Sequence, residues 1–200
     1  MQLITEKRSM SFDVRAEQNN RYGTYLYGVP IVFNQKVSIG GYYYEVIMPG
    51  ALDHTNMKDV RFLIGHDDKS IPLARSRNNN GNSTMQLMVT QRGLEIRVNL
   101  DTENNVNSRM LYSAVERGDI TGMSFAFTVD GDEWQDIDSE QPTRIVRSIK
   151  QVYEVSAVAF PAYDQTIIDI DSSRSQANNR EESQKRKGAI QRLNYWRQIK

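Results

Sequence analysis

The chain contains only two histidines, His54 and His66. Histidine titrates near neutral pH and is the commonest general base, so both are candidates for proton transfer. His66 follows the apolar run VRFLI and a glycine, at the expected end of a strand, where a side chain is held more rigidly than in a loop. His54 lies in the polar stretch ALDHTNMK after a Pro–Gly turn. Either could be an ordinary surface histidine, but His66 is the better candidate.

The candidate nucleophile is Ser124, in the segment ITGMSFAF. Side chains alternate along a strand, so Ser124 and Ala126 share one face while Phe125 and Phe127 share the other. We expect the bulky face to anchor the strand in the core and the small face to leave room for a substrate. The G-x-S-x-G motif of α/β-hydrolases is absent. The segment alone does not distinguish a nucleophile from an ordinary serine in a strand.

A third group would have to hold the histidine in the correct tautomer, and an acidic residue is the remaining choice. Glu154 is the main candidate because it interrupts the apolar segment QVYEVSAVAF, and a buried carboxylate is costly unless it is paired. Glu154 could instead lie at a sheet edge, and Asp67 and Asp68 are alternatives beside His66. Two histidines without cysteine make a weak metal site, so we expect neither a metal nor a cofactor.

Strands must position these residues, because most of the first 170 residues combine aromatic and β-branched side chains with glycine or proline punctuation. A glycine at position 93 between two apolar runs predicts a hairpin. The expected strands are Tyr22–Phe33, Gly40–Ile47, Val60–Ile64, Met85–Thr90, Leu94–Leu100, Met123–Asp130, Arg144–Lys150 and Val152–Phe160.

One segment has helical spacing instead, with apolar residues at positions 106, 110, 111, 114 and 115. It predicts a helix from about residue 105 to 117, capped by Asn104 or Asn105 and followed by Gly118. Many short strands with one such helix predict a mainly β fold with few helices, either a barrel or a sandwich.

The composition changes after Ile170, which divides the chain into an expected domain at 1–170 and a tail at 171–200. The polar segment Asp171–Lys187 is expected to be a linker, and the remainder could form a short amphipathic helix on binding. Arg174–Lys200 holds eight Lys/Arg against two Asp/Glu, so the tail is basic and the rest of this neutral chain is acidic. Such a division suggests separate roles for tail and body.

Several classes of protein are disfavoured by composition. The absence of cysteine excludes a disulfide framework and a thiol nucleophile. No apolar run approaches the roughly 20 residues of a membrane helix, and the first residues lack the apolar core of a signal peptide. We therefore expect a soluble protein that is not exported. An acidic body without a base-reading motif argues against specific nucleic-acid binding.

Six short sequence blocks follow one another along the chain: YEVIMPGAL at 44–52, FLIGHD at 62–67, IPLAR at 71–75, RGLEIRVNL at 92–100, RGDITGMSFAF at 117–127 and EVSAVAFPAY at 154–163. Each block alone is weak, but together and in this order they resemble the prohead proteases of tailed phages, which are capsid-maturation serine proteases. The resemblance covers roughly residues 20 to 170. It departs from the family pattern at Ala74 and Ala126, where glycine is usual, and at Leu52, where phenylalanine is usual.

The resemblance implies a β-barrel of the prohead protease type, related in fold to herpesvirus assemblins, with His66 and Ser124 as the catalytic pair. Glu154 is our choice as third member, and Arg144, Arg147 or backbone N–H groups are candidate oxyanion donors.

By the same resemblance, the implied substrates are phage scaffold, or a scaffold-like segment of the major capsid protein, and the protease itself. Action on itself leaves a homo-oligomer open. The implied location is the assembling prohead in the host cytoplasm. The tail would be self-cleaved or would dock on scaffold. The alternative is a non-catalytic assembly module that binds scaffold or capsid protein.

Overall fold

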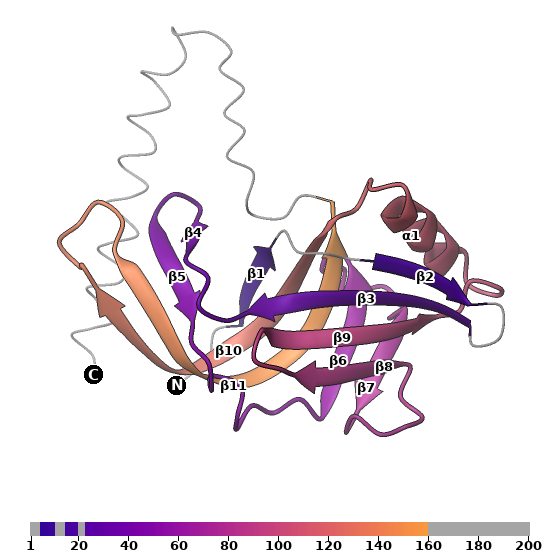
Figure 1. Cartoon of the computed structure of the whole chain (residues 1–200), viewed down its shortest axis with the longest axis horizontal. Coiled ribbons are helices and arrows are strands. Elements are labelled where there is room, and N and C mark those ends of the chain that lie inside the picture. The colour runs from indigo at the N-terminus through magenta and orange to yellow at the C-terminus, as the bar shows by residue number, and fades with distance from the viewer. Residues whose placement is uncertain (1–4, 11–14, 20–22, 160–200) are drawn as a thin grey trace, which may run out of the picture. The chain divides into compact units, whose positions relative to one another are not determined.

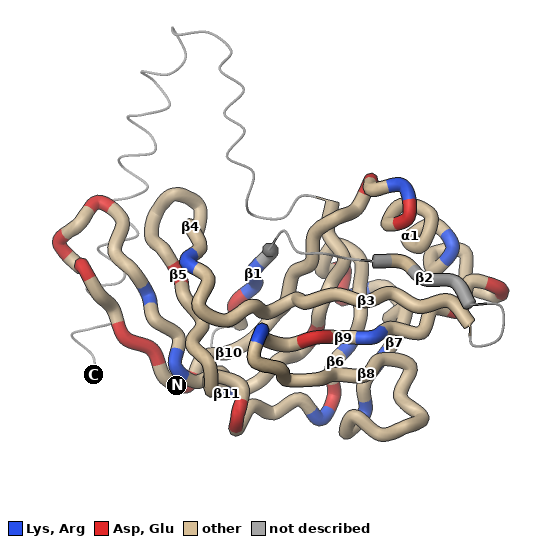
Figure 2. Tube along the Cα trace, viewed as in Figure 1, with Lys and Arg blue, Asp and Glu red and all other residues tan. Residues whose placement is uncertain are grey.

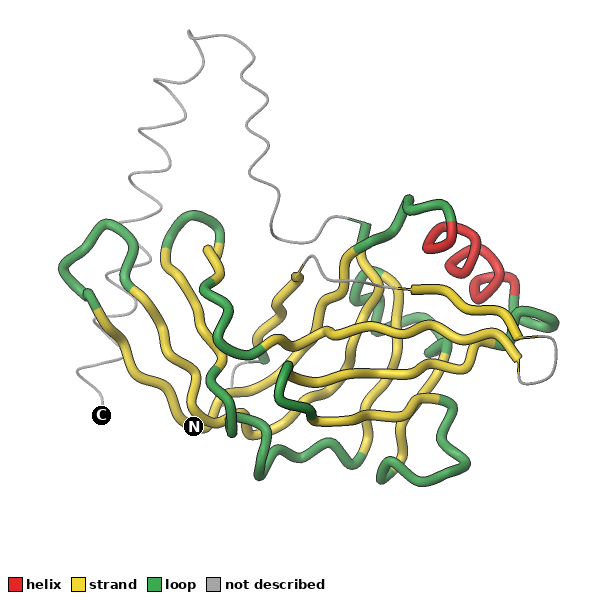
Figure 3. The backbone as a smooth tube through the Cα atoms, viewed as in Figure 1, coloured by secondary structure: helices red, strands yellow, loops and turns green. Residues whose placement is uncertain are grey.

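The structure is a computed structural model that describes residues 5–10, 15–19 and 23–159. This part of the chain holds eleven strands and one helix (Figure 3). In order they are β1 (Glu6–Met10), β2 (Arg15–Asn19), β3 (Gly23–Val32), β4 (Val37–Ile39), β5 (Tyr43–Ile47), β6 (Asp59–Ile64), β7 (Ala74–Arg77), β8 (Met85–Val89), β9 (Gly93–Leu100), α1 (Val106–Glu116), β10 (Gly122–Gln135) and β11 (Thr143–Val158). The expected tail at 171–200, and with it the end of the expected domain, lies outside the described residues.

The strands form two sheets rather than the closed barrel that we expected (Figure 1). One sheet follows the order β1-β10-β11-β5-β4, with β6 beside β11 and β7 beside β6, and the other follows β2-β3-β9-β8. A barrel requires the last strand to pair with the first. Among the described residues β1 and β4, which end the longer path, do not pair. The mainly β character is confirmed and the closed barrel is wrong.

Two long strands, β10 and β11, run antiparallel and bend strongly (Figure 1). The two segments expected at 144–150 and 152–160 are one continuous strand, and β10 continues beyond Asp130 to Gln135. Four register shifts occur between residues 126 and 132 of β10. Such bulges bend a strand and raise its twist, which a simple alternation pattern does not reveal. Acidic residues gather around the connection between the two strands (Figure 2).

One hydrophobic core joins both sheets and α1. The sheets approach closely where β3 passes β10, because a Cβ added at Gly28 would lie 2.1 Å from Met123 Sδ. Only glycine allows that approach without displacing Met123. The β10 segment that carries Ser124 is therefore fixed against the second sheet on one side.

The predicted helix and hairpin are confirmed. Asn105 caps α1 by accepting hydrogen bonds from two backbone N–H groups, and Gly118 follows the helix with a positive φ of 78°. The helix buries Leu111 and Val115, whereas Met110 from the expected apolar set is 65% exposed. β8 and β9 pair antiparallel around the turn at residues 90–92. No helix in the described ranges is long and apolar enough to cross a membrane.

Candidate active site

His66 lies in a tight turn directly after β6. Gly65 and His66 both have positive φ angles, 59° and 61°, and the Asp67 N–H donates to the Ile64 carbonyl at 3.1 Å. Left-handed backbone is uncommon for a residue with a side chain, although histidine tolerates it better than most. Strain of this kind concentrates at functional sites, where surrounding structure holds it in place. Here the turn directs the imidazole back over the sheet.

The register between β10 and β11 determines which side chains lie near the His66 imidazole. Ser124 lies opposite Ser156, and Ala126 lies opposite Glu154. On the other edge of β11, β6 runs parallel, with Ile64 beside Ala157. The end of β6 thus brings the histidine turn to the same end of the sheet as both side chains.

A chain of hydrogen bonds joins the three residues selected from the sequence. Ser124 Oγ lies 2.5 Å from His66 Nε2, and His66 Nδ1 lies 2.5 Å from Glu154 Oε1. A carboxylate can only accept, so Nδ1 carries a proton that it donates to Glu154. In the neutral ring, Nε2 is then free to accept the hydroxyl proton of Ser124. This is the arrangement that a serine nucleophile with a general base requires.

Ser156 completes the cluster, and sequence reasoning gave it no role. Its hydroxyl donates to Glu154 Oε2 at 2.5 Å and accepts from the His66 backbone N–H at 3.2 Å. It therefore holds both the carboxylate and the backbone of the histidine turn. The available signal was the strand alternation that places Ser156 on the same face as Glu154.

Two of the three residues, Ser124 and Glu154, are buried in this structure, whereas His66 is partly exposed. Ser124 is 0% exposed and Glu154 is 7% exposed, so the expectation of an open face beside Ser124 is wrong here. The reason is β1, which pairs antiparallel with β10 and places Ser9 opposite Ser124. The Ser124 hydroxyl oxygen lies 2.6 Å from the backbone carbonyl oxygen of Arg8. The sequence offered no strand pattern that predicted β1.

The remaining candidates lie apart from this cluster. His54 is exposed in the segment between β5 and β6. Asp67 is exposed and accepts hydrogen bonds from Ser70 and from the Lys69 N–H within its own turn, which lower the pKa of its carboxyl. Asp68 is also exposed. The closeness of these acids in sequence does not bring them to the imidazole, whose ring nitrogen faces Glu154.

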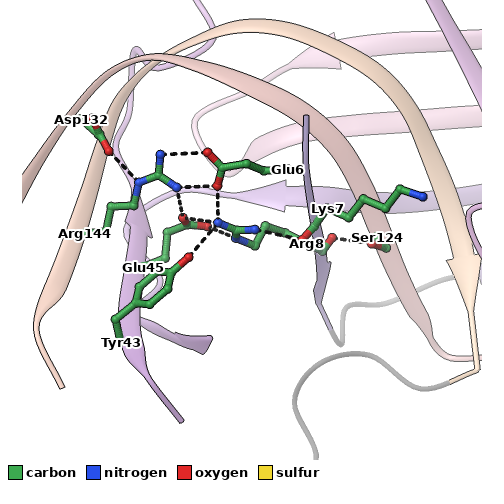
Figure 4. A network of polar contacts seen from close by, with 8 residues as sticks. All are labelled: Glu6, Lys7, Arg8, Tyr43, Glu45, Ser124, Asp132 and Arg144. Carbon is green, nitrogen blue, oxygen red and sulfur yellow. Dashed lines mark hydrogen bonds and ion pairs between the residues drawn. The ribbon is translucent and has the colours of Figure 1, made fainter. Parts of the chain in front are cut away.

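The two arginines considered as oxyanion donors are engaged elsewhere. Arg144 pairs with Glu6, Glu45 and Asp132 (Figure 4), and Arg147 forms an exposed pair with Glu133. Neither guanidinium group is among the polar contacts of Ser124.

A buried network of alternating charges lies beside the site and connects β1 to the sheet (Figure 4). Burial by itself would lower the pKa of Arg144, but Glu6 and Glu45 raise it above its ordinary value. Burial likewise opposes ionisation of Glu6, yet hydrogen bonding to Arg144 and the charge of Arg8 hold the pKa of Glu6 below its ordinary value. Both residues are thus charged at neutral pH, and their attraction fixes β1 in place.

Comparison with known proteins identifies the family of the chain. A family model described as caudovirus prohead serine protease matches residues 10–181. The chain belongs to this family. The prohead protease of Enterobacteria phage HK97 is 27% identical over 165 residues, a match that covers 79% of this chain. The chain spans 65% of the length of that relative.

Among solved structures, the bacteriophage T4 capsid assembly protease gp21 is similar, with a TM-score of 0.42 and 12% sequence identity. That likeness covers 78% of this chain and 99% of the T4 chain. In this member of the prohead serine protease family, the residues of the hydrogen-bonded cluster all lie within the matched range.

Proposed function

We propose that the chain is a serine endopeptidase with Ser124 as nucleophile, His66 as general base and Glu154 as the residue that orients His66. The observation that carries the proposal is the continuous hydrogen-bond path Ser124–His66–Glu154, which lies within the range matched by the family. Two residues from neighbouring strands and one from the turn after β6 meet in the order that acyl transfer needs.

The proposed reaction begins when Ser124 Oγ attacks a peptide carbonyl carbon while His66 Nε2 takes the hydroxyl proton. His66 then gives this proton to the leaving amine as the peptide C–N bond breaks, and water hydrolyses the resulting ester by the same route. Glu154 stabilises the imidazolium that forms in between. Ser156 acts as a positioning residue, because it contacts Glu154 and the His66 backbone and not the reacting atoms.

The biological substrates that we propose are phage scaffold, or a scaffold-like segment of the major capsid protein, and the protease itself. This rests on family membership and on the name of the HK97 relative, a prohead protease. The proposed place of action is the assembling prohead in the host cytoplasm. The basic residues at 174–200 suit docking on an acidic scaffold, and self-cleavage is proposed within 171–187.

Co-expression with the neighbouring capsid genes, read by intact mass, tests the proposal. Ser124→Ala should abolish processing, whereas Ser76→Ala should leave it unchanged. Ser76 is a matched control because it is also 0% exposed on a strand, and its hydroxyl has no partner within the described part of the chain. Processing at the wild-type rate by Ser124→Ala would show that Ser124 is not the nucleophile, whereas no processing by the wild-type chain would favour a non-catalytic assembly module.

A further inference from the structure

β1 pairs with the strand that carries Ser124. It is the edge strand of its sheet and pairs antiparallel with β10 from Glu6 opposite Phe127 to Met10 opposite Met123. Peptides commonly bind proteins by adding a strand to a sheet edge in this way. Within β1, the Arg8 carbonyl oxygen lies 2.6 Å from the hydroxyl oxygen of Ser124. A peptide carbonyl is the group that the proposed nucleophile attacks.

This contact also competes with activation of Ser124. The hydroxyl has one proton and two acceptors within reach, the Arg8 carbonyl at 2.6 Å and His66 Nε2 at 2.5 Å. A proton donated to the carbonyl is not donated to the base. With β1 in place, the sheet edge beside Ser124 is therefore occupied, and the Arg8 carbonyl competes with His66 for the hydroxyl proton.

The side chain of Arg8 is largely buried and contacts the carboxylate of Glu45. Its Nε and Nη2 atoms donate to the two carboxylate oxygens of Glu45 at 2.6 and 3.0 Å, and Nη2 also donates to the Tyr43 hydroxyl at 3.0 Å (Figure 4). The guanidinium carbon lies 5.5 Å from the ring centre of Phe127. A bidentate pair combined with an aromatic face is a specific binding arrangement for arginine.

The residue two positions before Arg8, Glu6, has a partner of its own on the sheet. Glu6 accepts hydrogen bonds from Arg144 Nη1 and Nη2 at 2.5 and 2.9 Å. Without β1, the sheet contributes Glu45 and Asp132 against Arg144, which leaves one net negative charge. That balance favours an incoming strand with a basic residue beside Glu45, and Arg144 favours an acidic residue two positions before it.

We propose that β1 is an internal analogue of the substrate, and that this protein cleaves peptides after a basic residue that Glu45 recognises. The inference rests on the proposed function. The substrate strand replaces β1 on β10, with an acidic residue facing Arg144 two positions before the basic residue. Ser124 Oγ forms an ester with the carbonyl carbon of the basic residue, the peptide C–N bond breaks, and the amine leaves with the proton carried by His66.

The first experiment measures how fast a small fluorophosphonate labels Ser124 in the full chain, read by intact mass. Arg8→Ala should raise the rate at least tenfold, because β1 loses its contacts with Glu45 and exposes the serine. Arg147→Ala is the control, since it removes an arginine from an exposed pair outside the network. Equal labelling rates in wild type, Arg8→Ala and Arg147→Ala would overturn the role of β1.

The second experiment compares two peptidyl phosphonates that differ only in carrying arginine or citrulline next to phosphorus. The arginine probe should label Ser124 at least tenfold faster, and Glu45→Gln should reduce this ratio toward one. Glu95→Gln, which alters an acid on β9 that accepts from Thr90 at 3.0 Å, should keep the ratio. Because the ratio compares two probes on one protein, a general loss of stability does not change it.

The outcomes separate this inference from the proposed function. If the fluorophosphonate labels Ser124 but the two peptidyl probes react equally, the specificity is overturned and the serine nucleophile stands. If no reagent labels Ser124 in any variant, both fail. Should Arg8→Ala not fold, as judged by circular dichroism, the ratio measured on the wild-type chain still tests the proposed specificity, and equal reaction of the two probes overturns it.

Discussion

The carboxylate of Glu154 has two partners, and replacing it by an amide makes a sharp test of the site. Oε1 accepts from His66 Nδ1 and Oε2 accepts from the Ser156 hydroxyl. Glu154→Gln preserves the size of the side chain, but it replaces two acceptor oxygens with one acceptor oxygen and one donor NH₂ group. If the amide oxygen stays with Ser156, the NH₂ group faces Nδ1, which must then accept. The ring proton moves to Nε2, and His66 can no longer take the proton of Ser124.

The size of the effect follows from that tautomer. In the serine protease template, an amide at the acidic position lowers kcat about 10⁴-fold, which corresponds to about 5.4 kcal/mol of transition-state stabilisation. We expect a loss on the order of 10³- to 10⁴-fold for Glu154→Gln, because the contact with Ser156 selects the unfavourable amide orientation.

Removing the Ser156 hydroxyl, which selects the unfavourable amide orientation, should restore part of the reaction rate of Ser124. In the double variant Glu154→Gln with Ser156→Ala, the amide oxygen is free to turn to His66 and to accept from Nδ1. We expect the double variant to react about tenfold faster than Glu154→Gln, in the manner of coupled residues whose effects do not add.

The assay is the rate of Ser124 labelling by a small fluorophosphonate, followed by intact mass, with ¹⁵N chemical shifts of the imidazole to report the tautomer. Glu95→Gln is the control and should react like wild type. The reasoning is refuted if Glu154→Gln reacts within tenfold of wild type. It also fails if adding Ser156→Ala to Glu154→Gln slows the reaction further.

Two further predictions concern stability. The pKa of Glu6 is held below its ordinary value of 4.5, so its contribution is present above that pH and is lost as pH falls through the lower folded value. Glu6→Gln should therefore cost about 1–2 kcal/mol in the free energy of unfolding at pH 7 and almost nothing near pH 2; a cost that does not change with pH would contradict this. Gly28→Ala should destabilise by about 1–3 kcal/mol in denaturant unfolding, since its Cβ meets Met123. In a Met123→Ala background, Gly28→Ala should lower the free energy of unfolding by less. An equal loss in both backgrounds would show that the contact with Met123 is not the cause.

The sequence predicted α1 and the β8–β9 hairpin because their ends depend only on a few neighbouring residues. Asn105 and Gly118 mark the two ends of α1 through hydrogen bonds and backbone angles that depend on a few neighbouring residues. The glycine at position 93 marks the β8–β9 turn in the same way. β1 escaped notice because Glu6–Met10 is a polar segment whose pairing depends on β10, more than a hundred residues later. The bend of β10 was missed for a similar reason, because bulges arise from pairing with β11.

The chemistry of the candidate site was determined by the sequence, which supplied a scarce histidine, a serine in an apolar strand and a carboxylate that needed a partner. Only the tertiary structure decided between Glu154 and the aspartates next to His66, because strand register and the left-handed turn set which acid the imidazole reaches. The tertiary structure alone also added Ser156 and placed Arg8 against Ser124. Residue types limit which reactions are possible, whereas contacts between distant segments depend on how the strands pair.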